Sequence, residues 1–130
     1  MDVLSSRILI RPSNLERSHA FYRDTLGLGV AREFGSGANY GLVFFLGSGL
    51  LEVSGQGDTD ARSGLALWLQ VRDTSAEVAR LTVKGLPIIR GPKVEPWGLI
   101  EAWIEDPDGV PIVLVQIPDD HPLRRDQRSF

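Results

Sequence analysis

Alternating apolar and polar residues near the start of the chain predict a strand that runs directly into a helix. Residues 7–11 read Arg-Ile-Leu-Ile-Arg, and successive strand residues point to opposite faces, so Ile8 and Ile10 share one face. The next three residues, 12–14, are Pro, Ser and Asn, which break the strand and offer capping side chains. Apolar and small residues then recur at helical spacing until Gly27, which is expected to end the helix.

Glycine-containing turns divide the next part of the chain into short strands. Strands are predicted at residues 30–34, 39–46 and 49–54, with hairpin-type loops at residues 35–37 and 47–49. Residues 55–63 contain Gly, Asp, Thr and Ser but almost no large apolar residue. This composition predicts a linker between two halves of the chain.

The second half of the chain repeats the order of the first. A strand is predicted at residues 65–71 and a helix at residues 74–84, with Gly85 as its stop. Three more strands follow at residues 87–90, 99–104 and 112–117, with a Pro-containing loop at residues 91–97 and a tight turn at residues 106–109. The repeat predicts an α+β fold of two βαβββ modules, at about residues 5–55 and 64–118 of one domain (residues 1–118), and a charged tail at residues 119–130.

Composition narrows the class of protein. A chain of 130 residues is long enough for one domain with its own core. It has no Cys, which removes disulfides, thiolate nucleophiles and Cys-ligated zinc. The net charge is -3, and the one basic cluster, Arg124, Arg125 and Arg128, shares its tail with acidic residues, so no nucleic-acid partner is expected. With no signal peptide and no apolar run of membrane-spanning length visible, we expect no membrane partner and a cytoplasmic protein.

Alternation along the strands also predicts which side chains share the face turned away from the helices. By the two-residue period this face holds Arg7, Leu9, Arg11, Leu50, Glu52, Ser54, Ala66, Trp68, Gln70, Glu101, Trp103, Pro111, Val113 and Val115. We expect these residues to line a concave sheet surface.

Six short motifs, taken in their order and spacing, resemble one known superfamily. They are Asn14-Leu15-Glu16-Arg17-Ser18, Phe21-Tyr22, Leu26-Gly27, Leu51-Glu52-Val53, Pro96-Trp97-Gly98 and Asp106-Pro107-Asp108-Gly109. Between residues 7 and 116 the chain resembles the vicinal oxygen chelate superfamily, which includes glyoxalase I, bleomycin-resistance proteins, fosfomycin-resistance enzymes and extradiol dioxygenases. The resemblance implies two βαβββ modules whose curved mixed sheets surround a cavity, and a homodimer in which each cavity is often built from both chains.

The resemblance also implies four positions where metal-dependent members place His or Glu. In this chain they fall at Arg7, at Glu52, at or beside Ala66, and at Val113, so Glu52 is the only retained ligand position. One carboxylate does not hold a divalent ion against water, because protein sites supply three or more ligands, and an arginine repels a cation. We therefore expect the chain to bind no metal and no cofactor. Because the superfamily's usual chemistry depends on a metal, we expect that chemistry to be lost as well.

The two histidines of the chain are also expected to play no part in a metal site. His19 falls on the first helix and His121 in the tail, so neither lies on a strand that is predicted to line the cavity. Both are expected at the surface.

Aromatic residues indicate what a cavity without a metal would bind. The candidates are Trp68 and Trp103 on the predicted concave face, Trp97 in the loop at its mouth, and Tyr40 with Phe44 or, alternatively, Phe45. Stacking against indole rings combines large apolar burial with favourable ring geometry, which favours a flat aromatic ligand. The alternative is that Trp68 and Trp103 are simply core residues.

Charged residues on the same predicted face supply polar anchors. Arg7 is expected to pair with Glu52, either as a structural salt bridge or with Arg7 or Arg11 free to bind an acidic or carbonyl group by a forked hydrogen bond. Glu101 shares this face. A general-base role for Glu52 is conceivable only if apolar surroundings raise its pKa.

These observations favour a metal-free, homodimeric protein that sequesters a small aromatic, antibiotic-like molecule, as bleomycin-resistance proteins do. The expected ligand-binding residues are Arg7, Leu9, Arg11, Tyr40, Phe44, Glu52, Trp68, Trp97, Glu101, Trp103 and Val113. The first alternative is a lyase, isomerase or dioxygenase of the same superfamily, metal-free or with unusual ligands. The second is a ligand-responsive interaction domain without catalysis.

Overall fold

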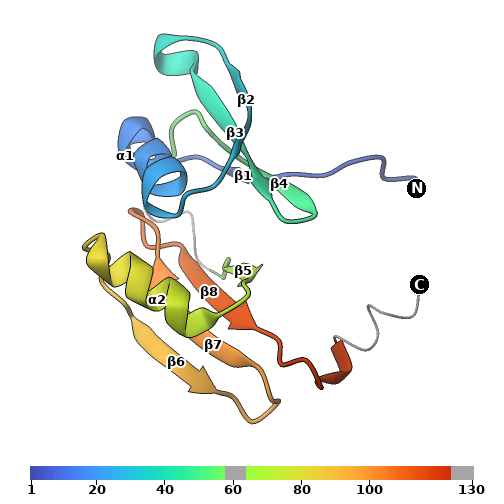
Figure 1. Ribbon diagram of the computed structural model, residues 1–130. Helices are drawn as coiled ribbons and strands as arrows, with labels where there is room; N and C mark the ends of the chain where they lie inside the picture. The colour runs from blue at the N-terminus through green and yellow to red at the C-terminus, as the bar shows by residue number, and fades with distance from the viewer. Residues whose placement is uncertain (58–63, 124–130) are drawn as a thin grey trace. The chain divides into compact units, whose positions relative to one another are not determined.

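A computed structural model describes residues 1–57 and 64–123. It contains two four-stranded mixed sheets, with strand orders β1-β4-β3-β2 and β5-β8-β7-β6 (Figure 1). The chain divides into two compact units, the first Met1–Gly64 with Asp106–Gly109 and the second Leu65–Glu105 with Val110–Phe130. The prediction of an α+β fold with two βαβββ modules is confirmed, because each unit has the same strand order around one helical segment.

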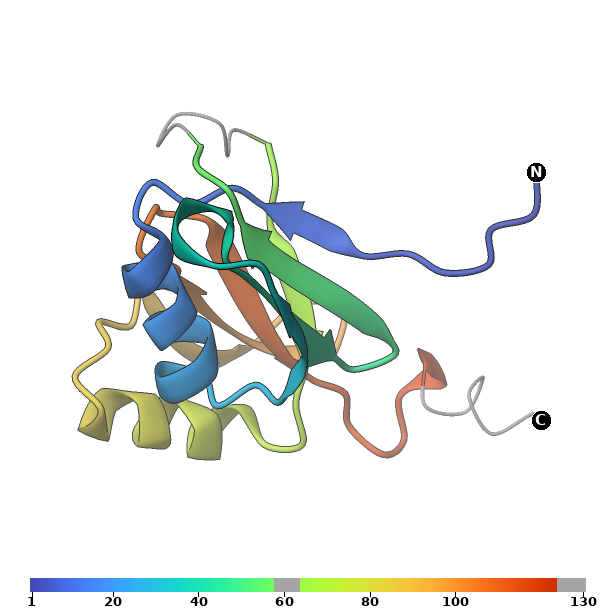
Figure 2. The ribbon, with the colours of Figure 1, turned by 90° about the horizontal axis from the view of Figure 1, so that it is seen from above.

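The first unit forms its elements where the sequence pattern places them. They are β1 (Ile8–Ile10), α1 (Leu15–Ala20), the π-helix η1 (Phe21–Thr25), β2 (Val30–Phe34), the 3-10 helix η2 (Gly37–Asn39), β3 (Gly41–Leu46) and β4 (Gly49–Ser54). The Asn14 side chain caps α1 by accepting from the Arg17 N–H. β1 runs parallel beside β4 (Figure 2). Gly27 ends the helical segment with φ +75°, a conformation that L side chains rarely adopt.

The second unit repeats the plan, with one difference from the predicted elements. Its elements are β5 (Leu67–Gln70), α2 (Thr74–Val83), β6 (Arg90–Val94), β7 (Ile100–Glu105) and β8 (Pro111–Gln116). The predicted strand at residues 87–90 and loop at residues 91–97 were wrong, because β6 occupies most of that loop despite Pro92. An edge strand tolerates a proline because it needs hydrogen bonds on one side only, and β6 pairs only with β7, with an irregular register after Arg90.

Each sheet buries one face against its own helix. In the first unit, register pairs Phe44 with Leu51, and the Phe44 ring lies 6.1 Å from the ring of Tyr22 on η1. Phe44 is therefore a core residue on the helix-covered face, which corrects its assignment to a ligand-binding face. In the second unit α2 packs on β6, β7 and β8 and buries Leu81.

His19 is buried, so the expectation that it lies at the surface was wrong. Its residue exposure is only 4%, and Nε2 lies 2.7 Å from the carbonyl oxygen of Val53. A carbonyl oxygen can only accept, so Nε2 carries the proton in this contact. The ring also meets Tyr40 edge to face at 5.5 Å. The helical turn that places Ser18 inside also directs His19 onto β4.

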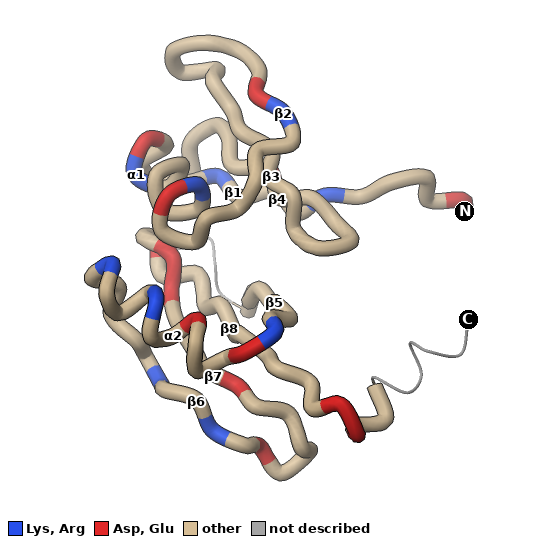
Figure 3. Tube along the Cα trace, in the orientation of Figure 1, with Lys and Arg blue, Asp and Glu red and all other residues tan. Residues whose placement is uncertain are grey.

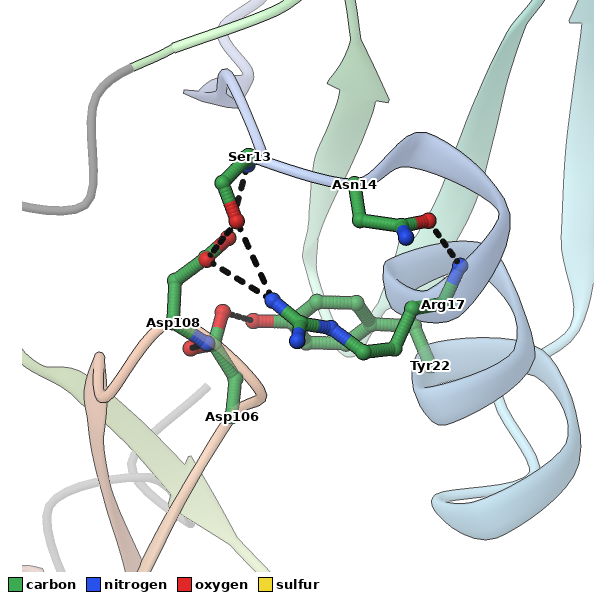
Figure 4. Close-up of polar contacts among 6 residues, drawn as sticks. All are labelled: Ser13, Asn14, Arg17, Tyr22, Asp106 and Asp108. Atoms are coloured by element: carbon green, nitrogen blue, oxygen red, sulfur yellow. Dashed lines mark hydrogen bonds and ion pairs between the residues drawn. The ribbon is translucent and has the colours of Figure 1, made fainter.

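The Asp106–Gly109 turn supplies the first unit with a network of polar contacts. The predicted tight turn is confirmed by a hydrogen bond from Gly109 N to Asp106 O at 2.9 Å. Asp108 accepts from the Ser13 N–H at 3.0 Å, from the Ser13 hydroxyl and from Arg17 Nη2 at 3.2 Å (Figure 4). The Tyr22 hydroxyl donates to Asp106 Oδ2 at 2.8 Å, and burial together with this carboxylate raises the Tyr22 pKa far above its usual value.

The distribution of charge and the hydropathy of the helices are two further features of the described residues. Basic and acidic residues occur in both units, and both signs occur on α1 and on α2 (Figure 3). Among residues 1–57 and 64–123, no helix has the length and apolar character needed to cross a membrane. Most of the predicted linker, residues 58–63, and the tail arginines Arg124, Arg125 and Arg128 lie outside the described residues.

Candidate functional site

In the first unit, two arginines converge on one glutamate at the sheet face opposite α1. Arg7 Nη1 donates to Glu52 Oε1 at 2.9 Å. Arg11 Nη1 lies 3.6 Å from Glu52 Oε2 and donates to the Ser54 hydroxyl at 2.6 Å, while that hydroxyl donates to Glu52 Oε2 at 2.6 Å. Leu9 is the register partner of Glu52 and is half exposed. The expected Arg7–Glu52 pair therefore exists and forms part of a closed network of four side chains.

This network does not fit a metal ion. At the first of the implied ligand positions the Arg7 guanidinium offers only donors, and both oxygens of Glu52 already accept from or pair with neighbours. Within residues 1–57 and 64–123, no three His, Asp or Glu side chains gather closely enough to hold a metal. The donor set here is that of an ion-pair network.

The Glu52 carboxyl is also unsuited to act as a general base. The hydrogen bond from Ser54, assisted by Arg7 and Arg11, lowers the pKa of Glu52 below its usual range against the opposing effect of burial. The conceivable general-base role required a raised pKa, so the structure contradicts it.

The lowered pKa of Glu52 gives the first unit a pH-dependent contribution to stability. Because the pKa of Glu52 is lower in the folded chain than in the unfolded one, this contribution is complete above the unfolded pKa. It is lost as the pH falls through the folded pKa. We expect Glu52→Gln to lower the midpoint of thermal unfolding at neutral pH, and we expect that difference from wild type to shrink in acid. A difference that stays constant from neutral to acidic pH would contradict the assignment.

The structure does not bring the predicted aromatic residues of the first unit to this network. Tyr40 donates to Glu33 Oε2 at 2.6 Å and contacts His19, which places it on the helix side together with Phe44. Phe45, the stated alternative, lies on the face of Glu52 and is 57% exposed. Adjacent strand residues point to opposite faces, so the choice between the two phenylalanines is decided by which face the helix covers.

In the second unit, the sheet face turned away from α2 presents a row of apolar side chains. Register pairs Trp68 of β5 with Val113 of β8, and Val113 with Trp103 of β7. Direct partners share a face, so the two indoles flank Val113 with a separation of roughly 9.5 Å between their backbones, two strand spacings. Trp103 packs on a buried cluster that also contains Leu99, Val115 and Ile117. Trp68 is 51% exposed.

Glu101 lies next to this row, one side-chain repeat along β7 from Trp103. It is only 7% exposed, and its Oε2 accepts a hydrogen bond from Trp97 Nε1 at 2.8 Å. The loop that carries Trp97 is held by a bond from Glu95 N to Leu99 O at 2.8 Å and by His121 Nε2, 2.9 Å from Trp97 O. The structure thus brings Trp68, Trp97, Glu101, Trp103 and Val113 together on one face of one sheet.

Sequence reasoning missed Arg90 and Glu95. Arg90 Nη2 donates to Glu95 Oε1 and, at 3.0 Å, to the backbone oxygen of Glu101, so it fixes the β6 edge beside the row. Its position directly opposite Trp103 follows from register alone. Glu95 fell in the predicted loop at residues 91–97, and the strand predicted for Arg90 had no known partner or register.

A family model described as Glyoxalase/Bleomycin resistance protein/Dioxygenase superfamily matches residues 5–114. No curated protein matches the chain. Among solved structures, a glyoxalase/bleomycin resistance protein from Streptomyces sp. CB03234 is 27% identical, with a TM-score of 0.70 over 86% of this chain and 99% of its own. TnmS3, an antibiotic binding protein from the same organism, is 26% identical with a TM-score of 0.75 over 90% and 98%. A lactoylglutathione lyase from Agrobacterium tumefaciens is 17% identical with a TM-score of 0.67 over 89% and 94%, a likeness of fold alone.

Proposed function

Given that the chain belongs to the Glyoxalase/Bleomycin resistance protein/Dioxygenase superfamily, we propose that it is a homodimeric protein that binds and sequesters a planar aromatic, antibiotic-like molecule without a metal. The row formed by Trp68, Val113 and Trp103 carries this proposal. Sequestration requires affinity and no reacting group, which suits a face that offers two indoles and few polar side chains.

The spacing of the row supports a flat ligand. A planar ring system in contact with both indoles needs roughly 7 to 8 Å between them, two carbon–carbon contacts. The backbones of Trp68 and Trp103 are roughly 9.5 Å apart, a spacing of the same order, and Val113 between them is already covered. Trp68 keeps half of its surface exposed although its cross-strand neighbour Val113 is buried. An exposed indole beside a buried apolar floor favours an external ligand as its partner.

Two further observations support binding over catalysis. The similarity to TnmS3, described as an antibiotic binding protein, agrees with the ligand class. A metal-dependent lyase, isomerase or dioxygenase is the alternative, and the Arg7–Glu52 pair stands against it because the guanidinium supplies no ligand.

The test is a titration of the protein with planar polycyclic aromatics, followed by Trp fluorescence and calorimetry. We expect binding in the micromolar range or tighter, and we expect Trp68→Ala to weaken it roughly fivefold to 150-fold, since stacking on an indole contributes about 1 to 3 kcal/mol. Trp68→Phe retains a ring and should keep most of the affinity. Val83→Ala, on the exposed side of α2, should change nothing.

Three results would count against the proposal. The first is the absence of binding by every polycyclic aromatic below millimolar concentration, and the second is full affinity in Trp68→Ala. The third is a stoichiometric metal in protein purified without a chelating column, together with a reaction that EDTA abolishes. Light scattering on the same samples tests the dimer, which a mass of one chain would contradict.

A further inference from the structure

Glu101 is a sparsely hydrogen-bonded carboxylate beside the Trp row. An ionised carboxylate offers about four lone-pair positions to donors. Among residues 1–57 and 64–123, its oxygens accept one hydrogen bond, from Trp97 Nε1 at 2.8 Å. The side chain is nonetheless buried, with 7% of the residue exposed. Its second oxygen, Oε1, is not among the fully buried unpartnered atoms, so it can accept from water or from a donor on a bound molecule.

Two basic side chains near Glu101, those of Arg90 and Lys93, do not pair with its carboxylate in the described part of the chain. Arg90 donates to Glu95 and to the backbone oxygen of Glu101, and not to its carboxylate. Lys93, the cross-strand partner of Glu101, is exposed and forms no ion pair with it in the described part of the chain. The contrast with Glu52 is direct, because Arg7, Arg11 and Ser54 satisfy both of its oxygens.

The position of Glu101 suits contact with a molecule on the row. Glu101 and Trp103 are two residues apart on β7 and share a face, so their backbones lie roughly 6.8 Å apart. Trp97 holds the carboxylate in one orientation through Oε2. A ring stacked between Trp68 and Trp103 would bring a substituent on its edge within reach of the other oxygen, Oε1.

We propose that Glu101 anchors the ligand and selects planar aromatic molecules that carry an N–H or O–H donor at the ring edge, cationic ones most strongly. This inference rests on the proposed function and names the ligand class for the same site. The Glu101 carboxylate accepts a hydrogen bond from the donor of the ligand, and the indoles stack on the ring of the ligand. Trp97 donates to the carboxylate and holds it in the orientation that accepts this bond. Discrimination comes from the carboxylate, because a ring without a donor leaves it unsatisfied in the complex.

The test compares two probes with the same ring system by calorimetry at slightly alkaline pH. Proflavine is a cation with two amino groups, and acridine is uncharged and has no donor. We expect wild type to bind proflavine roughly tenfold to a hundredfold more tightly than acridine, because hydrogen bonds to charged groups contribute about 1.5 to 3 kcal/mol. In Glu101→Gln we expect proflavine to lose about tenfold while acridine changes little.

Control variants separate position from net charge and from folding. Glu77→Gln on α2, which packs on the opposite face, removes the same charge and should leave the preference unchanged. Glu101→Asp keeps a carboxylate and should keep the preference for proflavine. The comparison of probes on wild type needs no variant, so it stands even where Glu101→Gln fails to fold. Equal affinities for the two probes in wild type would overturn the inference alone, and absence of binding by both would overturn the proposed function with it.

Discussion

Replacing Phe44 with alanine is expected to lower the free energy of unfolding by about 3 to 5 kcal/mol, the usual cost of removing a buried phenylalanine. Phe44 has no exposed surface, pairs with Leu51 and meets the ring of Tyr22 at 6.1 Å. Truncation leaves a cavity between β3 and η1 that these rigid neighbours cannot fill. Urea denaturation followed by circular dichroism measures the loss.

The next residue supplies a matched control. Phe45 is on the same strand and is the same residue type, but it points to the other face and is 57% exposed. Phe45→Ala is expected to cost about 1 kcal/mol or less, because little buried area is lost. Equal costs for the two substitutions, or a larger one at Phe45, would show that the helix covers the other face of this strand.

The second large effect is expected at Asp108 of the Asp106–Gly109 turn. Its side chain is nearly buried and accepts from the backbone and hydroxyl of Ser13 and from Arg17 (Figure 4). Asp108→Ala leaves the Ser13 N–H without its acceptor and removes a charge-assisted bond, so we expect a loss of about 3 kcal/mol. Thermal and urea unfolding both measure it.

Two variants sharpen the Asp108 experiment. Asp108→Asn keeps one acceptor oxygen and should lose about half as much. Asp24→Ala also removes an aspartate paired with an arginine, but both partners are largely exposed, and we expect a change of about 0.5 kcal/mol or less. If Asp108→Ala costs no more than Asp24→Ala, the turn does not contribute through these bonds.

Much of the fold could be predicted because the signals are local. The cap at Asn14 and the stops at Gly27 and Gly85 lie at ends of the two helical segments, and each acts within a few residues of its own position. Most of β6 was not predicted, because Pro92 indicates a break in a strand unless that strand is known to lie at the edge of a sheet.

The candidate site was predictable only in part. The two-residue period correctly places Trp68, Val113 and Trp103 on one sheet face, and register confirms that they are neighbours. Their role in ligand binding stays a prediction. The period could not show that the carboxylate of Glu101 accepts from Trp97 alone among the described residues, because that contact depends on how the loop before Leu99 folds back.

The sequence by itself determined the order of the elements, the repeat of the strand–helix–three-strand plan, and the presence of Arg7 at a position where the resemblance implies a metal ligand. These follow from periodicity, from turn chemistry and from resemblance. Only the tertiary structure decided that the helix covers Phe44 and not Phe45, that His19 is buried, and that Asp108 binds residues near α1. Alternation fixes which residues share a face, but only packing between distant segments decides which face is covered.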